Sequence, residues 1–131
     1  MRTAIWFSVL GLPNTGLLLP YTTQSPTLKK VTEYKTVEDI YEEIDRILNE
    51  EPTKKFGVGQ SLFYQMPFFA EPSDIIPDWC WHMIEDYFII KKYNVPMAKD
   101  LKSVDAWTSD CFILIDEELE NIKKHKAKLN G

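Results

Sequence analysis

The stretch TVEDIYEEIDRILNEEP, residues 36–52, has the clearest pattern in the chain, and the fold prediction starts from it. Its apolar residues recur at the i, i+3, i+4, i+7 spacing of one helical face. They are Val37, Ile40, Tyr41, Ile44, Ile47 and Leu48. Thr36 is a good N-cap, and the acidic residues after it lie at the positive end of the helix dipole. We therefore predict a helix over residues 36–51 that ends at Pro52, with Glu42 and Glu43 on the side opposite the apolar face.

The chain before this helix, residues 1–35, is predicted to be rich in strands. Residues 5–10 form a short apolar run with branched and aromatic side chains, followed by turn-forming Gly, Pro and Asn residues. The same start could be a signal peptide. It has one basic residue, a short apolar run and no small-x-small cleavage site, so we favour a buried strand. Residues 28–35 roughly alternate between apolar and polar residues, which predicts a second strand.

Residues 52–76 are predicted to be an aromatic loop with a short third strand at residues 62–66. Two further helices follow, over residues 77–94 and 103–129. In the first, Pro77 suits the first turn and Asn94 suits the left-handed C-cap position. In the second, Ser103 is the expected N-cap, and residues 111–115 form an unbroken apolar run. Such a run is either buried on more than one side or exposed as an oligomer interface. The interface residues would be Cys111, Phe112, Ile113 and Ile115.

Together these elements predict an α+β fold in one domain that spans residues 1–131. A small sheet of two or three short strands from the N-terminal half would pack against three helices, of which the last is long. Two cysteines, Cys80 and Cys111, are too few for a disulfide framework, and we expect free thiols in a reducing compartment. No stretch approaches the roughly 20 apolar residues of a membrane-spanning helix. The sequence therefore indicates a soluble, cytoplasmic protein with no membrane partner.

The charge balance favours some partners over others. The net charge of −5 argues against general nucleic-acid binding, which needs a basic surface to displace counterions from phosphate. An acidic surface is compatible with a basic protein partner, although the same charge also serves solubility alone. The lysines between residues 123 and 128 could contact phosphates only weakly, because an acidic block at residues 116–120 precedes them.

Motifs that would carry catalysis are weak in this sequence. Asp78, His82 and Glu85 share one helical face and could hold a divalent metal or act as an acid–base pair. Their order is the reverse of the Glu-x-x-His of helical di-iron sites, and no second helix supplies the missing ligands. Residues 54–60 combine lysines and glycines but match neither a P-loop nor a dinucleotide-binding motif. We therefore predict no catalytic residues and no cofactor.

The aromatic content, 13% of 131 residues, is high and is concentrated between residues 56 and 81. These rings either fill the core or remain exposed as anchors for a partner. The predicted partner-binding residues are Phe63, Tyr64, Phe68, Phe69, Trp79, Trp81, Glu42 and Glu43. The sequence favours a non-enzymatic acidic interaction module that inhibits or escorts a macromolecular partner, as immunity proteins, anti-defence inhibitors and other viral or mobile-element accessory proteins do. The alternatives are an assembly factor that acts as a homo-oligomer, and a small metal- or ligand-binding enzyme using the Asp78, His82 and Glu85 face.

Overall fold

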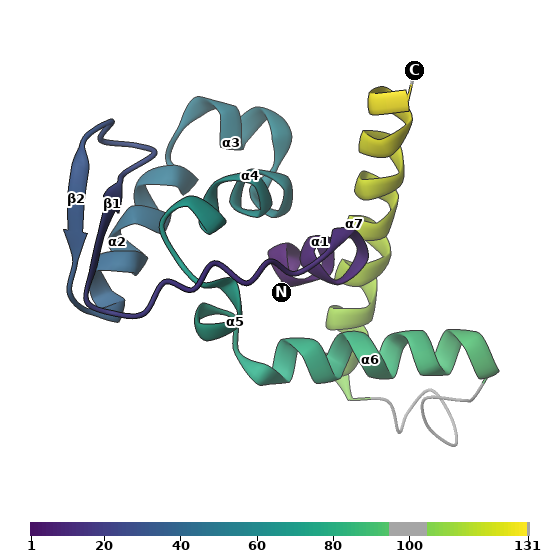
Figure 1. The fold of residues 1–131 in the computed structure, drawn as a ribbon. Coiled ribbons are helices and arrows are strands. Elements are labelled where there is room, and N and C mark those ends of the chain that lie inside the picture. The colour runs from purple at the N-terminus through teal and green to yellow at the C-terminus, as the bar shows by residue number, and fades with distance from the viewer. Residues whose placement is uncertain (95–104, 131) are drawn as a thin grey trace.

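A computed structural model describes residues 1–94 and 105–130 of the chain (Figure 1). The elements are α1 (Arg2–Leu10), β1 (Tyr21–Gln24), β2 (Val31–Tyr34), α2 (Val37–Leu48), α3 (Glu51–Phe56), α4 (Val58–Gln65), the 3₁₀ helix η1 (Met66–Phe68), α5 (Pro72–Ile75), α6 (Asp78–Tyr93) and α7 (Ala106–Asn130). The predicted α+β fold with a small sheet and a long C-terminal helix is confirmed. Within the described ranges, however, there are more helices than the three expected.

The sheet is a single antiparallel hairpin in which Tyr21 pairs with Tyr34 and Gln24 pairs with Val31. The strand predicted within residues 28–35 is therefore confirmed. Its partner strand is residues 21–24, which were not predicted to be a strand. The hairpin stands at one end of the molecule beside α2 (Figure 1). Helix α2 begins as predicted, because Thr36 and Asp39 form a reciprocal capping box at its first turn.

The prediction of a strand at residues 5–10 is wrong, because these residues belong to helix α1. This helix lies in the middle of the molecule, packed between α4 and α7 and also touching α6 (Figure 1). Ala4, Ile5, Trp6 and Phe7 are at most 1% exposed and form the centre of the hydrophobic core. Because five consecutive residues, 3–7, are buried, the centre of this helix is enclosed on every side, and its sequence shows an apolar run without helical periodicity.

The prediction of a loop and a strand over residues 52–76 is also wrong, because this segment consists of the short helices α3, α4, η1 and α5. Pro52 lies in the first turn of α3, where a missing N–H costs little, so it starts a new helix after the end of α2. Gly57, with φ of +92°, separates α3 from α4. Gly59 lets α4 approach α1 closely, since a Cβ at this position would lie 2.6 Å from Trp6 Nε1.

Helices α6 and α7 confirm the two helices predicted in the C-terminal half. Asn94 adopts the expected left-handed conformation at the end of α6. The predicted N-cap, Ser103, lies outside the described residues; Asp105 Oδ1 accepts a hydrogen bond from the Trp107 backbone N–H at 3.1 Å. Within residues 1–94 and 105–130, no helix combines the length and apolarity needed to cross a membrane.

Candidate functional site

The largest exposed aromatic side chains of α6 and α7 meet near the beginnings of these helices. The Trp79 and Trp107 rings lie 5.1 Å apart between centroids, in a tilted arrangement. Trp79 is 43% exposed and Trp107 is 54% exposed, so each ring packs on the other and leaves much of its surface in solvent. We call these two residues the tryptophan pair. They lie outside the face of α6 formed by Cys80, Ile84 and Tyr87, which is buried in the core.

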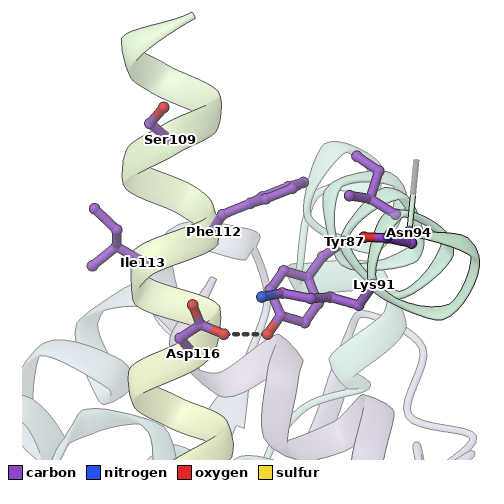
Figure 2. Close-up of a pocket in the computed structure, with 8 residues that line it drawn as sticks. Tyr87, Lys91, Asn94, Ser109, Phe112, Ile113 and Asp116 are labelled. Carbon is purple, nitrogen blue, oxygen red and sulfur yellow. Dashed lines mark hydrogen bonds between the residues drawn. The ribbon is translucent and has the colours of Figure 1, made fainter. Parts of the chain in front are cut away.

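A cavity of about 440 Å³ opens between the C-terminal half of α6 and the first half of α7 (Figure 2). It is lined by Tyr87, Ile90, Lys91, Asn94, Ser109, Phe112, Ile113 and Asp116. The Tyr87 hydroxyl donates a hydrogen bond to Asp116 Oδ1, and Lys91 Nζ lies 5.6 Å from the centroid of the Tyr87 ring. Burial and the hydrogen bond to the Asp116 carboxylate raise the pKa of Tyr87 to about 12. Tyr87 is therefore a protonated hydrogen-bond donor at neutral pH, and the cavity wall combines apolar and polar groups.

Besides the tryptophan pair and the cavity, α6 carries a group of exposed apolar side chains near its C-terminal end. Phe88, Ile89 and Tyr93 are 41%, 45% and 64% exposed, and together with Glu85 and Lys92 they line a shallow hollow. The exposed surface of α6 therefore mixes these apolar side chains with charged and polar residues.

The structure divides the aromatic residues that the sequence predicted for partner binding. Phe68 is 67% exposed, and Tyr64 and Trp79 are also exposed. Phe69 is fully buried. Phe63 and Trp81 are half-buried and pack against the core. The aromatic segment therefore supplies both core and surface.

Glu42 is exposed as predicted, but Glu43 is fully buried and is not accessible to a partner. Its carboxylate accepts hydrogen bonds from the hydroxyls of Ser25 and Thr27, from the Tyr34 hydroxyl at 3.1 Å, and from Arg46 Nη2 at 2.8 Å. Burial alone would raise the pKa of Glu43. The hydrogen bonds and the Arg46 charge outweigh burial and hold its pKa below the ordinary value. Glu43 thus fastens the β-hairpin to α2.

The residues predicted for an oligomer interface are mostly core residues of the chain itself. Cys111, Phe112 and Ile115 are 6%, 8% and 0% exposed, whereas Ile113 is 58% exposed. The run at residues 111–115 is therefore buried on more than one side of α7, and Ile113 is its only member that faces solvent. Both cysteines are free and buried.

Asp78, His82 and Glu85 lie on α6 with exposed side chains. Among residues 1–94 and 105–130, no group of three or more His, Cys, Asp or Glu side chains is arranged to hold a metal ion. The proposed metal face therefore gains no support from the geometry.

Trp107 is not among the partner-binding residues predicted from the sequence. It lies in the first turn of α7, two residues after Asp105, and no local sequence signal distinguishes its exposed ring from a core residue. Comparison with protein-family models, with curated proteins and with solved structures finds no match to this chain.

Proposed function

We propose that this protein is a non-enzymatic interaction module that binds a protein partner through the exposed surface of α6 and α7, and that it inhibits or escorts that partner. The observation that carries the proposal is the tryptophan pair, whose two rings pack on each other in a tilted arrangement and are about half exposed. Tryptophan is among the residues most enriched at the centres of protein interfaces.

The energetics of the pair favour this function. A large aromatic side chain buries roughly 150–250 Å² when it is fully enclosed. At about 25 cal/mol per Å², a partner that covers the exposed half of each ring would gain about 2–3 kcal/mol of binding free energy per tryptophan. The rings already restrict each other, so less conformational entropy is lost when a partner covers them. Two adjacent anchors of this size supply the central contact of a stable interface.

The charges around the pair indicate the character of the partner. Asp78 precedes Trp79, and Asp105 and Asp110 flank Trp107 in sequence; all three carboxylates are exposed. Charged groups at the rim of an interface mainly select partners and accelerate encounter. The surface therefore fits a partner with an apolar patch bordered by basic residues, in agreement with the net charge of −5.

The proposal is tested by affinity capture from the cells that naturally make the protein, followed by mass spectrometry. The test variant is Trp79→Ala combined with Trp107→Ala, and the matched control is Tyr41→Ala, an exposed aromatic residue on α2. We expect the control to retain the partner and the double variant to lose it, with both variants still folding cooperatively in urea. Undiminished capture by the folded double variant would refute the proposed surface.

A homo-oligomer formed through residues 111–115 has less support, because three of its four predicted interface residues lie in the core of the chain. Light scattering of the wild type and of Ile113→Asp separates this alternative from the main proposal. An oligomer that dissociates in the Ile113 variant would favour self-association instead.

A further inference from the structure

Two lysine-rich segments that are distant in sequence meet across a groove of about 500 Å³. Lys54 and Lys55 lie at the end of α3, and Lys124 and Lys128 lie on α7, one helical turn apart. The complete lining is Lys54, Lys55, Phe56, Gly57, Gln60, Asn121, Lys124, His125, Lys128 and Leu129. Neither segment alone forms a recognisable anion-binding motif, and only the fold brings them together.

The walls of the groove are held in place by packing around Trp6 of α1. Gly59 of α4 approaches the Trp6 ring closely, and the His125 ring lies 5.5 Å from it on the side of α7. The Tyr64 hydroxyl and His125 Nε2 are joined by a hydrogen bond of 2.6 Å, which links α4 directly to α7. The lysines therefore project from helices whose relative position is fixed, as a binding site requires.

The groove is strongly cationic although the protein is acidic. None of its lining residues carries a carboxylate. Lys54 pairs with Glu51 at 3.3 Å. Within the part of the chain that the structure describes, Lys55, Lys124 and Lys128 have no carboxylate oxygen within 4.0 Å. Lys124 and Lys128 also repel each other, as like charges at i and i+4 do. The helix dipole favours Lys54 and Lys55 in the last turn of α3 and Lys128 in the last turn of α7. It does not account for Lys124, which lies before the last turn of α7, or for the convergence of all four lysines on one groove.

The shape and chemistry of the groove indicate a small ligand with several negative charges and a ring. Its volume lies within the roughly 300–1,000 Å³ of typical small-molecule sites. Phe56 is 51% exposed and offers a ring face to a base, with Lys55 Nζ 5.2 Å from the ring centroid. A long polyanion is disfavoured by the net charge of −5 and by the acidic block at residues 116–120 on the same helix. We propose that this groove binds a nucleoside di- or triphosphate, with the lysines on the phosphates and Phe56 against the base.

The test is isothermal titration calorimetry of the full chain with ATP, inorganic tripolyphosphate and adenosine at physiological ionic strength. We expect ATP to bind best, tripolyphosphate to bind more weakly because it lacks the base, and adenosine not to bind. Combining Lys124→Gln with Lys128→Gln removes two charges from the groove and should weaken ATP binding by about tenfold or more, since each 1.4 kcal/mol is a factor of ten. Phe56→Leu should weaken ATP binding and leave tripolyphosphate binding unchanged.

The matched control combines Lys123→Gln with Lys126→Gln, which removes the same charge from the same helix at exposed positions that do not line the groove. This variant should bind ATP like the wild type. Equal losses in both double variants would overturn the proposal, because they would show general charge attraction. Absence of ATP binding at millimolar concentration would also overturn it, as would single-stranded oligonucleotide binding that is tighter than ATP binding. The outcome is independent of the tryptophan pair, so failure here leaves the proposed function standing.

Discussion

Replacing Glu43 by Gln tests whether one buried carboxylate fastens the β-hairpin to the helices. Glutamine has nearly the same shape, but its NH₂ group is a donor and would face Thr27 and Arg46, which are also donors. Breaking a fully buried ion pair costs about 3–5 kcal/mol. Because Arg46 is 35% exposed and can recover hydration, we expect a smaller loss of about 2–4 kcal/mol in the free energy of unfolding.

This loss is a large part of the roughly 5–15 kcal/mol that stabilises a domain of this kind, and it corresponds to a decrease of about 10 °C in Tm. Urea unfolding followed by tryptophan fluorescence measures it. The matched control is Glu42→Gln, which makes the same chemical change at the neighbouring, exposed position. The control should change stability by no more than about 0.5 kcal/mol.

The pH dependence gives a second, independent readout. The folded state holds the pKa of Glu43 below its ordinary value of 4.5, so the unfolded state binds the proton more readily. The stability contributed by the ionised carboxylate is therefore complete above about pH 4.5 and is lost as the pH falls through the folded-state pKa. The stability difference between wild type and Glu43→Gln should shrink in acid. Equal effects of the two substitutions at neutral pH, or a difference that does not change with acidity, would refute the role assigned to Glu43.

Three further predictions follow from packing. Phe69→Ala should cost about 3–5 kcal/mol because the side chain is fully buried, whereas Phe68→Ala should leave the urea midpoint nearly unchanged. Gly59→Ala should destabilise by about 1–3 kcal/mol and alter tryptophan fluorescence, because the new methyl group would collide with Trp6. The Cys111 thiol should react with a disulfide reagent only slowly in the native state and rapidly in urea, because burial raises its pKa and hides the sulfur; fast native reaction would contradict its place in the core.

The sequence predicted those helices that have both an amphipathic face and recognisable ends. Helices α2, α6 and α7 each bury one stripe and expose the rest, and the caps at Thr36 and Asn94 form as expected. Helices α1 and α4 were predicted as strands. In α1 the enclosing neighbours remove any polar face, and in α4 the aromatic residues suggested a strand. The first error arises because burial on every side leaves no helical periodicity, and the second arises because aromatic residues favour strands but also occur in helices.

The candidate sites were harder to predict than the fold. Glu43 belongs to an acidic helix and looks like a surface residue until the hairpin folds over it with two hydroxyls and a tyrosine. The lysine groove joins α3 to α7 across a separation that no local motif spans. Both sites form only when segments that are distant in the sequence pack against each other. No local sequence pattern predicts such a long-range contact.

The neighbouring residues Phe68 and Phe69 show how one aromatic segment supplies both core and surface. The hairpin fixes the backbone here, because the Tyr21 hydroxyl donates to the Phe69 carbonyl and the Thr23 hydroxyl donates to the Phe68 carbonyl at 3.2 Å. Phe69 points inward and stacks on Tyr34, so Phe68 is held in solvent by the same contacts. These hydrogen bonds order the backbone at both positions, so adjacent residues place one ring in the core and the next ring in solvent. The surplus of aromatic residues is therefore divided between the fold's small interior and its exposed surface.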